Sequence, residues 1–293
     1  MKRIMVTGAT GQLGGQVLNF LMQKAGAVSI SAIARDPSKI AGFQQQGVSV
    51  FQADYDDLAS LIKAFANIDV LYFVSASEIP KRMKQHENVL TAVRETGVKH
   101  VVYTSLQRKD ETKESPVAAV SEVHLYTEKW LKESGITYTI LKHTLYSEVI
   151  PMFIGGQVFD SGQIYLPAGD GKAAFATCTD MAEASANILT TSGHNNKVYE
   201  IASGQTYSYH DVAKILGEIS GKEIRYVSPT VGEFQKTLKS YGAPEVIVMI
   251  VTIFSQAIAL GEYDQPDQTL AGLLGREPET LASFLKRRYS KFQ

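Results

Sequence analysis

The chain has 293 residues, of which 44% are hydrophobic and 20% are charged, and this size allows a large core in one domain or in two closely joined ones. The net charge of −1 excludes a broad electrostatic attraction to nucleic acid or to an acidic membrane surface. The single cysteine, Cys178, excludes an intramolecular disulfide framework and fits a reducing compartment. Because the opening residues reach glycines after a short apolar run, they do not resemble a secretory signal, and we expect a cytoplasmic protein.

The first half of the chain alternates short apolar segments with amphipathic ones. Strands are predicted over residues 3–8, 28–34, 48–53, 70–76, 100–105 and 136–142, with helices between them over 11–24, 37–46, 58–66, 84–97 and 120–135. Alternation of this kind is typical of an α/β protein whose parallel sheet carries helices on both faces. With right-handed crossovers, the fold class is a doubly wound parallel sheet of the Rossmann, NAD(P)-binding type.

After residue 146 the alternation becomes less regular, although one more helix and strand follow over 179–193 and 198–203. We therefore expect the chain to leave the first domain and to return to it once. The predicted dinucleotide-binding domain comprises residues 1–146 and 177–203. The predicted substrate lobe, which is smaller and mostly helical, comprises residues 147–176 and 204–293.

A glycine-rich turn, Gly8-Ala9-Thr10-Gly11-Gln12-Leu13-Gly14, follows the first strand and opens the first helix. Gly8 would permit a tight turn, and Gly11 would let the backbone approach a pyrophosphate at the positive end of the helix. Gly14 would let the helix pack closely on the strand. The spacing is G-x-x-G-x-x-G, and the alternative is an ordinary glycine turn without a ligand.

The second predicted strand ends at Ala34-Arg35-Asp36-Pro37, where the adenine ribose of a bound dinucleotide would lie. An arginine at this place accommodates a 2′-phosphate, so Arg35 favours NADP(H) over NAD(H). Asp36 precedes Pro37 and suits helix capping. The alternative for Arg35 is a solvated surface side chain.

The next two strand ends also carry candidate cofactor contacts. Asp54 could accept a hydrogen bond from the adenine amino group, or it could cap the helix over 58–66. Ser75, Ala76 and Ser77 are small residues at the exit of the fourth strand. They would let a dinucleotide pass across the carboxyl ends of the strands, where open α/β sheets bind their ligands.

These segments resemble one family. The NmrA-like branch of atypical short-chain dehydrogenase/reductases has segments similar to TGATGQLGG, IARDP, QADYDD and YTSL. The bacterial NADPH:quinone oxidoreductases of that branch, and the related triphenylmethane-dye reductases, resemble this chain further at LYSE and at AGDGK before TDMAEA. The resemblance covers most of residues 1–235. It implies an NADPH-dependent oxidoreductase with cofactor contacts at Gly8, Ala9, Thr10, Gly11, Gln12, Leu13, Arg35, Ser75, Ala76, Ser77, Lys129, Thr139, Ile140, Leu141, Lys142, His143 and Thr144.

The segment HLYTEKWL, residues 124–131, lies where short-chain reductases usually carry Tyr-x-x-x-Lys, but the residue four before Lys129 is Leu125. Leu125 and Lys129 share a helix face, so Lys129 could reach the nicotinamide ribose or remain a solvated lysine. Tyr126 aligns instead with Val123 and Trp130, which favours core packing over catalysis. The resemblance implies a branch without the catalytic tyrosine.

Without the tyrosine, the enzyme lacks a positioned acid, which restricts the acceptors that it can reduce. A ketone that accepts a hydride becomes a basic alkoxide and needs a positioned acid. A quinone becomes a hydroquinone anion with delocalised charge, and a cationic dye becomes neutral, so neither requires that acid. What remains for the protein is to position donor and acceptor, while the cofactor supplies the hydride.

Candidate acceptor contacts follow the fifth and sixth strands: Ser105, Leu106, His143, Tyr146 and Glu148. Ser105 occupies the place of the active-site serine of short-chain reductases, and Tyr146 could stack on an aromatic acceptor. Our predicted catalytic set is therefore Lys129, Ser105 and Tyr146, with lining or packing as the alternative for each. No histidine or cysteine spacing predicts a metal site.

Two functions are consistent with these residues. The first is an NADPH-dependent reductase of a small aromatic or quinone-like acceptor. The second is a non-catalytic NADP(H)-binding redox sensor of the NmrA type, which would also lack the tyrosine. The apolar run over 246–254 is too short for membrane insertion. A helix so apolar should be buried on all sides, so it would cover the acceptor pocket, form a homodimer interface or lie at the centre of the lobe.

Overall fold

The computed structural model describes residues 2–24 and 28–292. The chain divides into two compact units, each formed from three stretches of sequence. Unit 1 consists of Met1–Leu106, Val120–His143 and Cys178–Glu200, and unit 2 consists of Gln107–Ala119, Thr144–Thr177 and Ile201–Gln293.

Unit 1 is built on a seven-stranded sheet with the order β3-β2-β1-β4-β5-β6-β9. The strands are β1 (Lys2–Val6), β2 (Val28–Ala34), β3 (Ser49–Gln52), β4 (Val70–Phe73), β5 (His100–Leu106), β6 (Thr137–His143) and β9 (Lys197–Ile201). The pairs from β3 through β6 are parallel. Strand order reverses direction between β1 and β4, so the carboxyl ends of these two strands open a crevice for a ligand. The predicted doubly wound fold is confirmed.

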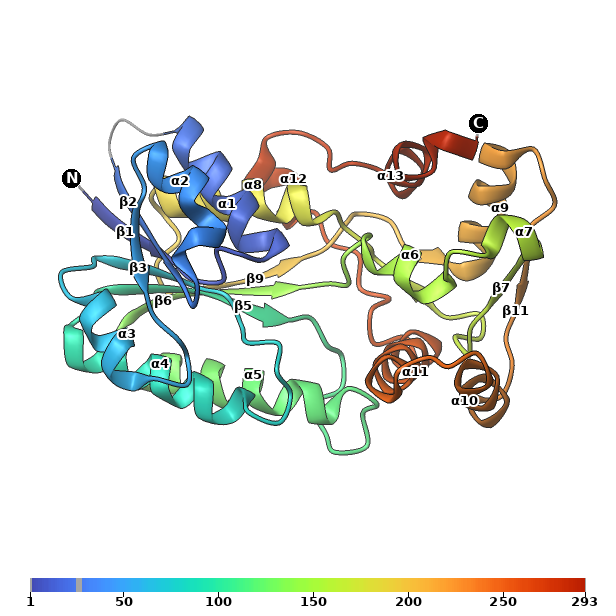
Figure 1. Cartoon of the computed structure of the whole chain (residues 1–293), viewed down its shortest axis with the longest axis horizontal. Helices are drawn as coiled ribbons and strands as arrows, with labels where there is room; N and C mark the ends of the chain where they lie inside the picture. The colour runs from blue at the N-terminus through green and yellow to red at the C-terminus, as the bar shows by residue number, and fades with distance from the viewer. Residues whose placement is uncertain (1, 25–27, 293) are drawn as a thin grey trace. The chain divides into compact units, whose positions relative to one another are not determined.

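Helices cover both faces of this sheet (Figure 1). They are α1 (Gln12–Gln23), the short η1 (Pro37–Ile40) and α2 (Ala41–Gln45), α3 (Leu58–Phe65), α4 (Arg82–Thr96), α5 (Ala118–Glu133) and α8 (Cys178–Thr190). Helices α1 and α8 pack together on one face, and α3, α4 and α5 cover the other. The core on that second face joins strand residues such as Leu71 and Val101 to Phe65, Val93 and Leu131 of the helices.

Unit 2 contains two small two-stranded sheets and most of the remaining helices. Strands β7 (Gln163–Tyr165) and β11 (Arg225–Val227) are parallel, and β8 (Lys172–Ala173) and β10 (Tyr207–Ser208) are antiparallel. The helices are α6 (Val149–Ile154), α7 (Val158–Ser161), α9 (Tyr209–Ser220), α10 (Val231–Ser240), α11 (Glu245–Ala259), α12 (Thr269–Leu274), α13 (Leu281–Arg288) and η2 (Ser290–Phe292).

The segment 107–119, which follows β5, belongs to unit 2, whereas the boundaries drawn from the sequence place it in the dinucleotide-binding domain. Glu262 holds it there. The buried Glu262 carboxylate accepts hydrogen bonds from the backbone N–H groups of Lys109 and Asp110, at 2.8 and 2.9 Å, and from Ser115 Oγ at 2.8 Å. Hydrogen bonds to a buried charged group are among the stronger ones in proteins, so they order this loop against the segment that follows α11.

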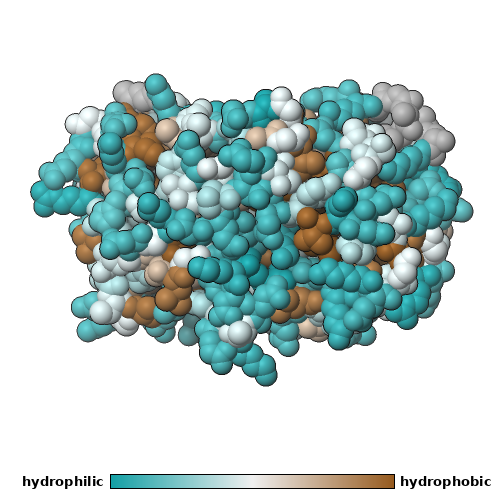
Figure 2. Space-filling model, turned by 180° about the vertical axis from the view of Figure 1, so that it is seen from behind, coloured by the Kyte–Doolittle hydropathy of each residue, from teal (hydrophilic) through white to brown (hydrophobic). Residues whose placement is uncertain are grey.

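Helix α11 is not buried on all sides, and that prediction is wrong. Val248, Val251 and Ile258 are buried, but Val246 and Met249 are 52% and 42% exposed. The helix therefore presents an outer apolar stripe, defined here by Val246 and Met249, that the described chain covers only in part. Hydrophilic side chains predominate on the face drawn in Figure 2, with hydrophobic ones in small separate groups. Within the described ranges, no helix has both the length and the apolarity needed to cross a bilayer.

Candidate functional site

The glycine-rich turn lies at the carboxyl end of β1 and opens α1. Gly8 has φ +63°, a left-handed conformation that favours glycine, and the Gly11 N–H donates to Gly8 O at 2.9 Å. A Cβ on Gly14 would lie 2.4 Å from Gly8 O, so only glycine allows this approach of helix to turn. No acidic residue occupies the first turn of α1 and no side chain caps it. Its terminal N–H groups can therefore bind an anion, and the turn fits a dinucleotide pyrophosphate.

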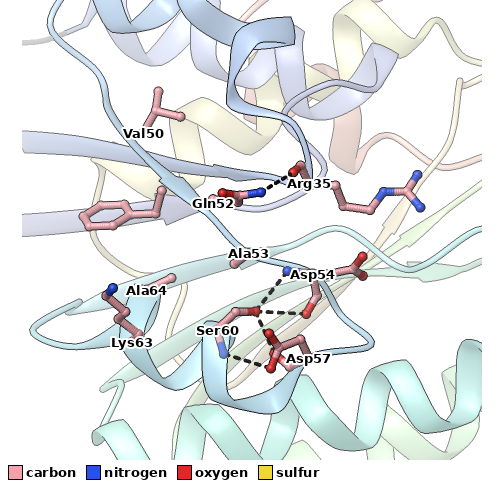
Figure 3. A pocket seen from close by; sticks show the side chains of 10 residues that line it. Arg35, Val50, Gln52, Ala53, Asp54, Asp57, Ser60, Lys63 and Ala64 are labelled. Carbon is pink, nitrogen blue, oxygen red and sulfur yellow. Dashed lines mark hydrogen bonds between the residues drawn. The ribbon is translucent and has the colours of Figure 1, made fainter.

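The chain between β2 and α3 surrounds a pocket of about 540 Å³ (Figure 3). Its lining includes the candidate residues Arg35 and Asp54 together with β3 and α3 side chains. The Arg35 side chain is 71% exposed and pairs with Glu78 at 3.2 Å. An exposed ion pair contributes only about 0–1 kcal/mol, so the guanidinium can exchange Glu78 for a phosphate with little loss.

Asp54 does not cap α3, and that alternative is wrong. Asp57 is the N-cap residue, with its carboxylate accepting from Ser60 N at 3.2 Å. The Asp54 carboxylate accepts instead from Asp56 N at 3.0 Å, and Ser60 Oγ bonds the Asp54 backbone (Figure 3). Asp36 caps η1 as expected, accepting from Ser38 N at 3.0 Å.

Side chains of neighbouring elements fix the backbone of the residues that follow β4, at the exit of this strand. Ser75 N donates to Thr104 Oγ1 at 2.9 Å, and Ala76 N donates to His86 Nε2 at 3.2 Å. Ser77, the third candidate, is exposed. The backbone of Ser75 and Ala76 is therefore positioned by side chains of β5 and α4, at the carboxyl edge of the sheet where ligands bind in this fold class.

Two buried histidines below this exit are held in the neutral state. Because the Ala76 N–H can only donate, His86 Nε2 is the acceptor, and Nδ1–H donates to Thr127 Oγ1 at 2.9 Å. Burial, with the nearby Arg82 charge, lowers the pKa of His86 to about 3. In the same way, Arg82 Nη2 donates to His124 Nε2 at 2.9 Å, so His124 bears its proton on Nδ1, 2.7 Å from the Tyr103 hydroxyl.

The contact that Ser105 makes with α5 shows which face of this helix lies against the carboxyl edge of the sheet. It is buried at the end of β5, and its hydroxyl donates to Glu128 Oε1. Glu128 lies four residues after His124, which is also buried, so these two residues share the inner helix face. The inner face of α5 therefore carries His124 and Glu128, one residue before the positions Leu125 and Lys129 that the sequence motif indicated.

The structure corrects the predictions for HLYTEKWL. Lys129 is exposed, and Leu125 is only half-buried, so the pair does not form the inner face. Tyr126 is 37% exposed, so the prediction that it packs in the core is wrong. Each helical residue turns about 100°, which puts Tyr126 about 200° from His124 and therefore on the opposite side.

Strand β6 brings only its last residues to the carboxyl edge. Thr139 donates to His194 O at 2.7 Å and contacts His100 Nε2 at 2.8 Å, near the amino end of the strand. Ile140 belongs to the core. At about 3.3 Å per residue, Thr139 lies roughly 13 Å from His143, so the structure does not support cofactor contacts at Thr139 or Ile140. Leu141 is likewise buried within the strand.

The remaining candidates are divided between the units. Lys142 pairs with Glu200 at 3.3 Å, and His143, with its pKa lowered to about 3 by burial, ends β6 in unit 1. Leu106, half-buried, is the last residue of β5. The buried Thr144 and the half-buried Tyr146 and Glu148 belong to unit 2, where Tyr146 forms a β-bridge with Ala176.

Sequence reasoning missed the polar residues that support the site, namely Arg82, His86, Tyr103 and Glu128. A signal was present in their spacing, because Arg82 and His86, and likewise His124 and Glu128, are four residues apart on their helices. The residues that the structure describes contain no group of three or more potential metal ligands.

Known proteins show the same combination of elements. The model of the NmrA-like family matches residues 1–285. Quinone oxidoreductase 2 of Escherichia coli strain K12 is 38% identical over 279 residues, which cover 95% of this chain and 96% of that protein.

Two solved structures contain the cofactor. An NADPH-dependent quinone oxidoreductase from Escherichia coli, complexed with NADPH, has a TM-score of 0.89 and 36% identity, covering 98% of this chain and 99% of that one. The triphenylmethane reductase of Citrobacter sp., complexed with NADP(H), has a TM-score of 0.89 and 36% identity, covering 97% and 99%.

The close approach of α1 to the glycine turn makes a direct prediction. Gly14→Ala should lower the free energy of unfolding by about 2–3 kcal/mol, because its Cβ overlaps Gly8 O. Gly42→Ala is the matched control, since α2 leaves space around Gly42, and it should be neutral or stabilising by about 0.5–1 kcal/mol. Urea unfolding of both variants measures the difference, and equal stabilities would contradict the packing role of Gly14.

Proposed function

Since the chain belongs to the NmrA-like family, we propose that it is an NADPH-dependent reductase of quinones or similar conjugated acceptors. One observation carries this proposal. The face of α5 beside Ser105 carries His124 and Glu128 and no tyrosine, and the glycine turn after β1 fits a dinucleotide. The relatives named quinone oxidoreductase and triphenylmethane reductase, with their NADPH and NADP(H) complexes, support the same reaction class.

NADP(H) is the cofactor, and NADPH supplies the hydride when bound. The backbone from Gly8 to Leu13 would bind the pyrophosphate at the start of α1. Arg35 would hold the 2′-phosphate, which distinguishes NADPH from NADH. Ser75 and Ala76, fixed by Thr104 and His86, would support the cofactor at the β4 exit.

The acceptor would meet side chains at the ends of β5 and β6. Ser105 and Leu106 end the first of these strands and His143 ends the second. Burial lowers the pKa of His86 and of His143 to about 3, so neither carries an extra proton that it could release near neutral pH. Water would protonate the hydroquinone anion after hydride transfer.

Steady-state oxidation of NADPH in the presence of a panel of quinones tests this function. Absorbance at the nicotinamide band should fall only when both NADPH and a quinone are present. If the protein binds NADPH but no quinone accelerates its oxidation, the reductase proposal is wrong and a non-catalytic NADP(H) sensor takes its place.

Arg35 is exposed and available to bind the 2′-phosphate, so its removal should affect NADPH and not NADH. Arg35→Ala should weaken NADPH binding about ten- to a hundredfold, as expected for loss of a charge-assisted phosphate contact, and should leave NADH binding nearly unchanged. Lys63→Ala, which removes a cation from the other side of the same pocket, is the control. Isothermal titration with both cofactors gives the two affinities. Equal losses for NADPH and NADH would contradict the assignment.

Removal of the Tyr126 hydroxyl should have little effect on the reaction. Tyr126 is on the outer side of α5, so Tyr126→Phe should retain quinone reduction within about threefold. A general acid would instead show a loss of order a hundredfold or more. The kcat of the two proteins at saturating NADPH decides between these outcomes.

We also propose that the outer stripe of α11 is a homodimer interface. Val246→Asp combined with Met249→Asp should convert a particle of twice the 32.1 kDa chain mass into a monomer, because buried charge in an apolar interface is costly. Val198→Asp, at a similarly exposed apolar residue of β9, is the control. Light scattering measures the mass, and a wild-type monomer, or a double variant with unchanged dimer mass, would refute this interface.

A further inference from the structure

A buried guanidinium lies directly below the β4 exit. Arg82 is the first residue of α4 and is only 6% exposed. Its Nη2 donates to Ser75 Oγ and to His124 Nε2, both at 2.9 Å, and its Nη1 donates to the backbone oxygen of Val120 at 3.3 Å. The side chain is therefore fixed against β4 and α5.

The Arg82 guanidinium forms no direct ion pair in the described chain. Its hydrogen-bond partners are a hydroxyl, a neutral imidazole and a carbonyl, and no carboxylate of residues 2–24 or 28–292 forms an ion pair with it. The buried Nε–H also has no hydrogen-bond partner there. Burial lowers the pKa of the Arg82 guanidinium, but a guanidinium keeps its proton at any physiological pH. Burial of a charge without an ion-pair partner is costly, so the burial of Arg82 points to a functional role.

The position of this charge matters for a ligand. Ser75 follows β4, one of the two strands between which the sheet order reverses, and Arg82 touches its hydroxyl. Helix α4 adds the partial positive charge of its N-terminus, and its first turn contains no acidic residue. At the β4 exit, Arg82 and this helix terminus therefore contribute a positive potential of low screening, which a negative charge formed there would experience strongly, whereas the buried Glu128 lies at the end of β5, bonded to Ser105.

Hydride transfer places different charges on different acceptors. A neutral quinone that gains a hydride becomes a hydroquinone anion, and a proton from water then completes the hydroquinone. A cationic triphenylmethane dye that gains a hydride becomes neutral. The positive charge that forms on the oxidised nicotinamide is common to both reactions, so it cancels when the two rates are compared.

We propose that Arg82 is a positioning residue that takes over the electrostatic part of the missing tyrosine's role. It orients Ser75 and His124, and its field stabilises the negative charge that develops on a quinone during hydride transfer. This inference rests on the proposed reductase function. It makes the protein selective for acceptors that become anionic, relative to acceptors that start as cations.

Arg82→Gln tests the proposal, because glutamine keeps hydrogen-bonding capacity and removes the charge. For a neutral quinone, kcat should fall at least tenfold. For a cationic triphenylmethane dye, kcat should stay the same or rise, so the quinone-to-dye ratio should fall at least tenfold. Arg82→Lys should restore most of the ratio, and Arg94→Gln, which removes an exposed charge from the last turn of the same helix, should leave it unchanged.

The alternatives give different results. A parallel loss with both acceptors would show that Arg82 is only structural and would overturn the proposal. If Arg82→Gln does not fold, Arg82→Met takes its place, because methionine is also uncharged and fills the buried channel with an apolar chain. A higher KM for NADPH with an unchanged ratio would also overturn the proposal and assign the charge to the cofactor phosphates.

The two proposals fail in distinguishable ways. A wild-type protein that reduces no quinone would refute the reductase function itself. An active wild type whose quinone-to-dye ratio is unchanged in the neutral variants would refute only the role of Arg82.

Discussion

The hydrogen bond from Ser105 to Glu128 joins the inner face of α5 to the carboxyl edge of the sheet. With Glu128 held at the end of β5, His124 one turn earlier must also point inward, where it meets Tyr103 and Arg82. The same rotation turns Tyr126 outward. The rotation of α5 about its axis therefore decides which residues support the site, and it keeps Tyr126 away from them.

The polar groups below the site form one connected set whose protonation states follow from their partners. The Ala76 N–H can only donate a hydrogen bond, and it donates to His86 Nε2. The Arg82 guanidinium can likewise only donate, and it donates to His124 Nε2. Each of these histidine nitrogens is therefore an acceptor without a proton. Connected networks of this kind are rigid because each member restricts the next. The site is thus arranged in advance to stabilise charge by fixed dipoles and a fixed cation, and an acid is not needed for an acceptor that spreads its charge.

The fold and the dinucleotide turn could be predicted from the sequence because both depend on local signals: apolar periodicity, strand–glycine–helix context and the cap at Asp36. The site residues of α5 could not be predicted, because HLYTEKWL offers two possible inner faces one residue apart. Contacts with residues distant in sequence, such as Arg82 and Ser105, decide which face is buried. Asp57, and not Asp54, caps α3 because it directly precedes Leu58, the first residue of the helix. Glu262 shows the same limit, since its partners lie about 150 residues away in sequence.

In the proposed mechanism, hydride reaches the acceptor without a proton from the protein. Single-turnover reduction of a quinone, measured from pH 5 to 9 in H₂O and D₂O, tests this claim most directly. We expect a flat pH profile, a rate that slows when the transferred hydrogen of NADPH is deuterium, and a solvent isotope effect close to one. A rate that falls about tenfold per pH unit above a single pKa, with a large solvent isotope effect, would show a protein acid at work and contradict the mechanism.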